Sequence, residues 1–261
     1  MKLPQLLTPN QPVSQAQTQT ILWVWVAGFL ALWLVSPFPF LPTPGEVLAA
    51  LLDLWQNYSL GDQLLTSFTL NVEAVGLASL LSLVLAYCST IPAFRPVVEA
   101  WGKLRFLSMI GLVFAFTMMT HSGHALKLAI LVFVVSVFFV TGMTDVILAI
   151  PKEQYDLART LRMSEWQVLW EVVVLGTAAE GFVVLRQNAA MSWLTISFVE
   201  SIERSEGGVG ALLATQDKYF HVAAIMAIQL LVLTLGLGQD WALGWLRGVC
   251  CPYADLTRRR G

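Results

Sequence analysis

Charged residues are scarce in this chain. Only 12% of its 261 residues are Asp, Glu, Lys or Arg, whereas an ordinary soluble domain has about 25%. The net charge of −2 supplies no basic excess for a nucleic-acid partner. Apolar residues fill the difference, since 57% of the chain is hydrophobic and ten tryptophans and fourteen phenylalanines lie in long apolar runs. This composition is typical of an all-α, polytopic membrane protein.

Cysteine is also scarce, and three residues are too few for a disulfide framework. Cys88 lies inside an apolar run, where a small packing residue is expected. Cys250 and Cys251 are adjacent, and no second Cys or His pair lies near them in sequence to complete a zinc site. We therefore expect no metal site, with a metal or lipid role for this pair as the alternative.

Apolar runs long enough for spanning helices recur along the chain. A span needs about 20 apolar residues, and candidates lie near 21–41, 68–91, 105–120, 125–150, 177–199 and 220–246. Six spans are predicted, with five as the alternative because the third run is short and the fourth long. The first run has no signal-peptide cleavage pattern and is interpreted as a retained span. Residues 1–20 and the basic 247–261 are predicted tails around a transmembrane domain at 21–246.

Positive charge is biased to one side of these spans. With the N-terminus inside, eleven Lys and Arg residues fall in inner segments and three in outer segments. The inner residues are Lys2, Arg95, Lys103, Arg105, Lys152, Arg159, Arg162, Arg247, Arg258, Arg259 and Arg260. The outer residues are Lys127, Arg204 and Lys218. By the positive-inside rule, both termini and the 151–176 segment are predicted to be cytoplasmic.

The outer segment 42–66 carries a helix signal. Pro44 is followed by Gly45-Glu46, and apolar residues then recur at near-helical spacing. We expect a short interfacial helix anchored by Trp55 and Tyr58. A binding loop is the alternative.

A polar interruption at 151–167 separates two of the apolar spans. Glu153 and Asp156 near its start, and Arg159 near its end, suit the dipole of a helix that begins at Lys152. Ser164 and Gln167 have the spacing of a capping box, which predicts a second helix from Glu165. The segment is therefore predicted to be a helix, a turn and a helix that re-enters the membrane.

This segment resembles the "EAA" loop of permease subunits of bacterial ABC importers, more narrowly of the nitrate, sulfonate and taurine type. The resemblance rests on Asp156-Leu157-Ala158-Arg159-Thr160-Leu161, then Ser164 and Trp166-Gln167. Three other segments are similar to the family: 41–47 after the first span, Thr141-Gly142 before the loop, and Val199-Glu200 followed by the Gly-rich 207–210. It covers roughly residues 40–246.

The resemblance implies a type I ABC importer-like transmembrane domain in a bacterial inner membrane. It implies a second permease copy or paralogue, an extracytoplasmic solute-binding protein, and cytoplasmic ATPase subunits that bind the ATP and Mg. The loop residues implied at the ATPase contact are Glu153, Asp156, Ala158, Arg159, Leu161 and Ser164. The sequence agrees with one of these implications. It has no G-x-x-x-x-G-K-[ST] loop, so ATP hydrolysis is expected on a separate chain.

The loop departs from the family pattern at three positions. Arg162 stands where the family has a glycine, and Gly176 and Glu180 stand near expected prolines. Glycine allows a tight turn between helices, so a wider turn is expected at Arg162. Altered coupling, or a scaffold or regulatory subunit that does not transport, is therefore an alternative function.

Polar groups inside apolar spans are candidates for a substrate pathway, because burying them in lipid is costly. In the fifth span and its end these are Arg186, Asn188, Ser192, Thr195 and Glu200. Arg186 would suit a small anionic solute such as nitrate, a sulfonate or taurine. The alternative to a pathway role is that these polar groups form hydrogen bonds between helices. For Arg186 a further alternative is that its side chain reaches to the cytoplasmic surface.

The remaining polar groups suggest little chemistry. His121 and His124 are three apart, and an interfacial turn is preferred to a shared metal. Asp145 is expected to pair with Lys152 or Arg159, and Glu73 with a partner such as Arg186. An intramembrane enzyme that uses these acids or His121 is a weak alternative, because no catalytic spacing is recognised. No catalytic residue is therefore assigned.

Overall fold

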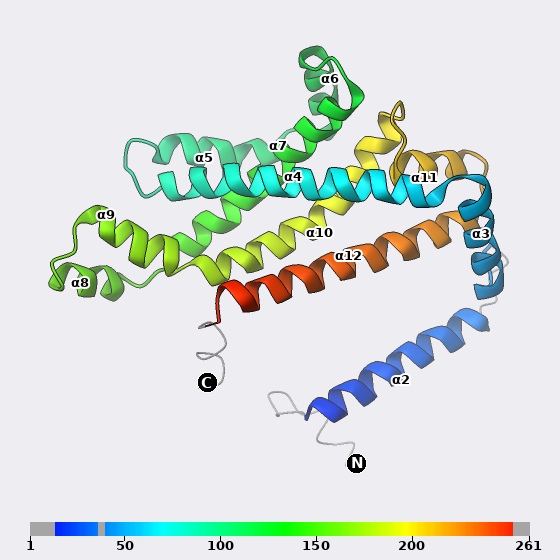
Figure 1. The fold of residues 1–261 in the computed structure, drawn as a ribbon, viewed down its shortest axis with the longest axis horizontal. Helices are drawn as coiled ribbons and strands as arrows, with labels where there is room; N and C mark the ends of the chain where they lie inside the picture. The colour runs from blue at the N-terminus through cyan, green and yellow to red at the C-terminus, as the bar shows by residue number, and fades with distance from the viewer. Residues whose placement is uncertain (1–13, 36–39, 253–261) are drawn as a thin grey trace.

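The computed structural model describes residues 14–35 and 40–252, and every regular element in these two ranges is a helix (Figure 1). This confirms the predicted all-α class. The elements are α2 (Gln15–Leu34), α3 (Pro44–Asn57), α4 (Leu60–Cys88), α5 (Arg95–Lys103), η1 (Leu104–Phe106), α6 (Met109–Met119), α7 (Gly123–Leu148), α8 (Lys152–Thr160), α9 (Glu165–Val168), η2 (Leu169–Leu175), α10 (Ala178–Ile202), α11 (Val209–Lys218) and α12 (Val222–Cys250).

Three long helices form a layer, with α10 between α4 and α12 (Figure 1). Helix α7 packs across α4 and α10, and α5 and α6 lie against α7. Helices α3 and α11 close one end of the layer, and α8 and α9 lie at the other. We call these the α3 end and the α8 end.

Four of the described helices are long and apolar enough to cross a membrane: α2, α4, α7 and α12. The number rises to six if each of two bent helix pairs is one span. Helix α10 belongs to one bent pair, because η2 joins it at 49°. Helix α2 runs apart from the layer, and none of its span is buried (Figure 1). The first predicted span also covers 36–39, which lie outside the described residues.

The span predicted at 105–120 is not one straight helix. The helical segment Arg95–Phe106 ends at Leu107, where the backbone becomes extended, and α6 then leaves at 112°. The eleven residues of α6 rise only about 16 Å, so α6 alone is too short to cross a bilayer. Residues 15–20, predicted as tail, lie in α2, and α12 continues to Cys250. Residues 1–13 and 253–261 of the predicted tails lie outside the described residues.

The helix predicted after Pro44 is confirmed as α3. Thr43 caps it, accepting a hydrogen bond from the Glu46 amide, while Glu46 accepts from the Thr43 amide at 2.7 Å. Its inner face buries Val47 and Leu54 against Leu60 of α4 and apolar residues of α11 and α12. The α3 end of the layer is therefore held by an apolar cluster drawn from four helices.

The turn after α8 is as tight as a glycine turn, so the wider turn expected at Arg162 is wrong. Arg162 itself adopts the left-handed conformation, with φ +58°. The Met163 amide donates to the Ala158 carbonyl at 3.2 Å, and the Arg162 amide donates to Arg159 at 2.9 Å. This pair of bonds is the Schellman motif that usually has glycine at this position. The hydrogen bonds and the flanking helices hold an arginine in a conformation that is unfavourable for it.

Replacing Arg162 by glycine should therefore stabilise the turn. A left-handed residue with a side chain costs about 1 kcal/mol, and glycine removes that cost at some loss of chain entropy. We expect Arg162→Gly to raise the free energy of unfolding by roughly 0.5–1 kcal/mol, measured as slower amide exchange over residues 158–163. Gln154→Gly is the control, since a glycine inside exposed α8 should speed this exchange. Faster exchange in Arg162→Gly would contradict the assignment of strain.

Candidate functional site

Helix α8 packs one face against α7 and η2. Tyr155 contacts the cluster of Met143, Ile147 and Val173, and desolvation raises the pKa of its hydroxyl. Ala158 is only 4% exposed, covered by other residues of this chain. The side chain of Ala158 therefore faces its own chain, and its predicted contact with a partner stays a prediction.

The opposite face of α8 is open and partly apolar. Glu153 and Asp156, two of the predicted contact residues, are exposed there. Leu157 is 62% exposed and Leu161 64%, and Trp166 of α9 is 72% exposed. Sequence reasoning missed Leu157 and Trp166. The signal was available, because Leu157 and Leu161 are four residues apart and so share one side of a helix. We call Leu157, Leu161 and Trp166 the apolar patch.

The angle between α8 and α9 is held by two side-chain interactions. Arg159 Nε donates to Glu165 Oε1 at 3.2 Å, and this hydrogen bond raises the pKa of Arg159. The predicted capping box is confirmed: the Ser164 amide donates to Gln167 Oε1 at 2.8 Å, and the Gln167 amide donates to Ser164 Oγ. Arg159 and Ser164 therefore set the shape of the loop, and the apolar patch and its acids form its outer surface.

A bend joins this loop to α10. Residues 169–175 form a π-helix, and the next helix leaves at 49°. At Gly176 the Val172 carbonyl lies so close that a Cβ would overlap it. The Thr177 hydroxyl donates to the Val173 carbonyl at 2.7 Å. The bend lies where a proline was expected. It is formed instead by Gly176, which lies against a carbonyl, and by the neighbouring hydrogen bond from the Thr177 side chain to the backbone.

The predicted pathway residues of α10 lie on its buried side. Ser192 accepts a hydrogen bond from Asn71 of α4 at 2.8 Å. Asn71 in turn accepts from Gln239 of α12 at 3.1 Å, and Gln239 accepts from Trp193 Nε1 at 2.7 Å. This chain of bonds ties the three helices of the layer together and corresponds to the interhelical alternative. Asn188 and Thr195 are buried as well, and they donate to carbonyls of their own helix.

Arg186 is neutralised within the layer. Its guanidinium binds both carboxylate oxygens of Asp240 on α12, with Nε 2.7 Å from Oδ1. The guess that Glu73 pairs with Arg186 is wrong, since Glu73 lies 3.3 Å from His124 Nε2. The pairing expected for Asp145 is wrong too, because Arg159 binds Glu165 and no ion pair of Asp145 occurs within 14–35 and 40–252. No cluster of metal ligands is found in the same ranges.

One face of α10 has no partner among residues 14–35 and 40–252. Gln187, Ala190, Leu194 and Phe198 are exposed and recur every three or four residues. Residues on the other side of the helix, such as Ser192 and Ile196, are buried. Helix α10 therefore has a face bonded into the layer and a free face, and the predicted pathway residues lie on the bonded one.

Glu200 joins two other helices to α10 at the α3 end. Its carboxylate accepts from the Ser67 hydroxyl of α4 at 2.8 Å and from the Gly210 amide of α11 at 2.9 Å. Lys127 of α7, 1% exposed, donates to the Gly207 carbonyl at 2.8 Å and is near enough to interact electrostatically with Glu200. At Gly208, with φ +114°, a Cβ would overlap the Glu200 carboxylate. The predicted Val-Glu and Gly-rich signature is thus one hydrogen-bonded unit.

Removing this carboxylate should destabilise the fold. In Glu200→Ala the Gly210 amide and the Ser67 hydroxyl lose buried partners, which costs about 1–3 kcal/mol for each group. We expect the midpoint of thermal unfolding in detergent to fall by several degrees. Tryptophan fluorescence monitors the unfolding. Asp217→Asn, an exposed acid on α11, is the matched control and should shift it by less than about one degree. Equal midpoints for the two variants would contradict the role of Glu200.

Comparison with known proteins agrees with this architecture. The family described as the binding-protein-dependent transport system inner membrane component matches residues 63–247, from α4 to near the end of α12. No curated protein matches the chain. The matched range includes the 151–176 loop, all of α10 and the Glu200 unit. The chain therefore belongs to the family of inner-membrane permease components of binding-protein-dependent transport systems, a transport family and not a known enzyme family.

Proposed function

We propose that this chain is the permease subunit of an ABC importer and that its α8–α9 loop docks onto a separate cytoplasmic ATPase, which binds the ATP and Mg. The apolar patch is the observation that carries the proposal. Leu157, Leu161 and Trp166 are exposed within residues 152–167, where the other exposed residues are all polar or charged. Exposed apolar groups rimmed by charge are typical of protein–protein contact. The acids Glu153 and Asp156 supply the polar rim.

The charge bias supports the orientation. Arg95, Lys103, Arg105, Lys152 and Arg159 gather around the α8 end, which suits the cytoplasmic side. Both termini are then cytoplasmic, and the α3 end faces outward, where a solute-binding protein would deliver its load. The resemblance to importers of the nitrate, sulfonate and taurine type supports a small anionic solute as the substrate.

A second permease copy or a paralogue fits the free face of α10. Gln187, Ala190, Leu194 and Phe198 would meet it, and the pathway would run between the two subunits. Because Arg186 is occupied by Asp240, recognition of an anion's charge falls to the binding protein. Asn188, Ser192 and Thr195 then support the wall of the pathway from behind, with Glu200 at its outer end.

The geometry at Arg162 favours coupling over a scaffold role. The departure from the family glycine was the main reason to expect altered coupling, and Arg162 retains the glycine-type turn. The loop is also continuous with α10 through the bend at Gly176. A force applied to the apolar patch would therefore be transmitted to α10, which carries the free face.

The direct experiment purifies the chain from its native membrane and identifies what accompanies it. A protein with a G-x-x-x-x-G-K-[ST] loop should co-purify, and ATP hydrolysis by the assembly in liposomes should rise with binding protein loaded with nitrate or taurine. ATPase association without solute uptake would support the scaffold instead. Turnover of a substrate by the isolated chain, with no ATPase present, would rule out the permease proposal.

The docking surface has its own test. Leu161→Asp places a charge in the apolar patch, and we expect association with the ATPase to weaken about tenfold or more, since burying a leucine contributes about 1.5–3 kcal/mol. Pull-down of the ATPase by tagged chain measures this. Phe220→Asp is the matched control, because Phe220 is 85% exposed at the α3 end. Equal pull-down by both variants would refute docking through the patch.

A further inference from the structure

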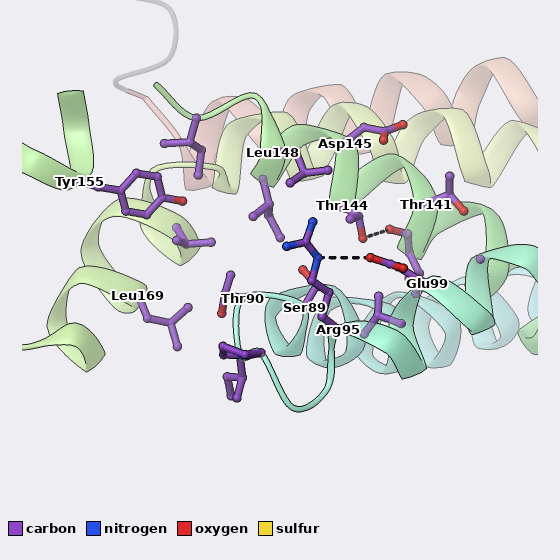
Figure 2. Close-up of a pocket in the computed structure, with 18 of the residues that line it drawn as sticks. Ser89, Thr90, Arg95, Glu99, Thr141, Thr144, Asp145, Leu148, Tyr155 and Leu169 are labelled. Atoms are coloured by element: carbon purple, nitrogen blue, oxygen red, sulfur yellow. Dashed lines mark hydrogen bonds and ion pairs between the residues drawn. The ribbon is translucent and has the colours of Figure 1, made fainter. Parts of the chain in front are cut away.

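A cavity of about 940 Å³ lies at the α8 end, between the start of α5, the last turns of α7, and α8 with α9 (Figure 2). Tyr155 and Leu169 lie on one side of it, Asp145 and Leu148 on a second, and Thr90 and Arg95 on a third. Trp166 of the apolar patch and Arg159 of the loop also line it, whereas no residue of the free face of α10 does. The docking and pathway proposals assign no ligand to this space.

The wall of the cavity carries an excess of positive charge. Five basic and three acidic residues line it: Arg95, Lys103, Arg105, Lys152 and Arg159, with Glu99, Asp145 and Glu165. Two pairs cancel, since Arg95 binds Glu99 and Arg159 binds Glu165, each at 3.2 Å. Lys103, Arg105 and Lys152 then face only Asp145, and none of these four is in an ion pair within the ranges 14–35 and 40–252. A ligand with negative charge fits this surplus.

Arg95 is poised for such a ligand. Its guanidinium points into the cavity (Figure 2), and only Nε is bound to Glu99. The two terminal nitrogens make no hydrogen bond in the described part of the chain. They could bind two oxygens of one phosphate group, which is the geometry that arginine favours.

Part of the wall is apolar and still accessible. Leu148, which is 67% exposed, and the half-buried Ile91 and Leu169 line it. A free phosphate would gain nothing from this surface, whereas an acyl chain would remove it from water. Phe94 and Val97 of the α5 region are exposed nearby, as expected for residues that face lipid. A basic rim over an apolar wall matches an amphiphile with an anionic head.

We propose that this cavity binds an anionic phospholipid of the cytoplasmic leaflet, with its phosphate on Arg95 and Lys103 and an acyl chain along Leu148 and Leu169. The choice of leaflet rests on the orientation proposed above. Basic pockets between spanning helices on the cytoplasmic side are known to take such head groups. The lipid would bridge α5 and α7 to the α8–α9 loop and so stabilise the loop against the layer.

Native mass spectrometry of the full chain in detergent tests the site, using phosphatidylglycerol and phosphatidylcholine of identical acyl chains. The wild-type chain should retain phosphatidylglycerol in preference. Glycerol phosphate, which has no acyl chain, should not bind. Equal retention of both lipids would overturn the proposal, and binding of glycerol phosphate at the same affinity would reassign the cavity to a soluble phosphate ester.

The double variant Arg95→Gln/Lys103→Gln locates the binding. It should retain phosphatidylglycerol about tenfold more weakly, given the contribution of each basic residue near an anionic surface. Arg162→Gln/Lys218→Gln is the charge-matched control, since neither residue lines the cavity, and it should bind as wild type. Equal weakening in both variants would show that net charge is responsible and would overturn the site.

No ATPase or solute is present in these measurements. Lipid retention can therefore succeed if the docking proposal fails, and it can fail if docking succeeds. The thermal unfolding midpoint of each double variant checks its folding. It should stay within about two degrees of wild type, because the two side chains substituted in each variant are exposed.

Discussion

The buried carboxylate of Glu200 is the interaction on which the α3 end of the molecule depends. It accepts from α4 and α11 at the same time, while Lys127 of α7 holds the adjoining Gly207 carbonyl. Each donor and acceptor in this unit would be costly to bury alone. Their mutual satisfaction fixes where four segments meet, and Gly208 is needed there because a side chain would displace the carboxylate. The α3 end of the layer is therefore rigid.

The same physical constraint shapes the middle of the layer. Lipid offers no hydrogen bonds, so polar groups in spanning helices must find partners within the protein. Asn71, Ser192 and Gln239 meet this need across three helices, and Arg186 meets it with Asp240. These bonds link α10 to α4 and α12 at several heights. Helix α10 is thus set up to move together with its neighbours as one body.

Local features of the structure were largely predictable from the sequence. The capping boxes at Thr43 and Ser164 depend on residues three positions apart, so the sequence contains all the information they need. Pairings between distant residues were not predictable. Arg186 and Asp240 are 54 residues apart, and nothing in either span's hydropathy specifies which helices become neighbours. Ala158 shows a related limit, because helical spacing identifies a face but not whether that face meets the chain itself or a partner.

The two ends of the molecule differ in how they are held. The α3 end is locked by a buried carboxylate, whereas the α8 end depends on an exposed ion pair, a turn with Arg162 in a left-handed conformation and a π-helix next to Gly176. Exposed ion pairs contribute little to stability, and strained or irregular backbone is held only by its surroundings. The loop can therefore shift at lower cost than the α3 end. Because the bend at Gly176 is continuous with α10, a force applied at the loop would turn the layer about its rigid α3 end, and the free face of α10 would tilt with it.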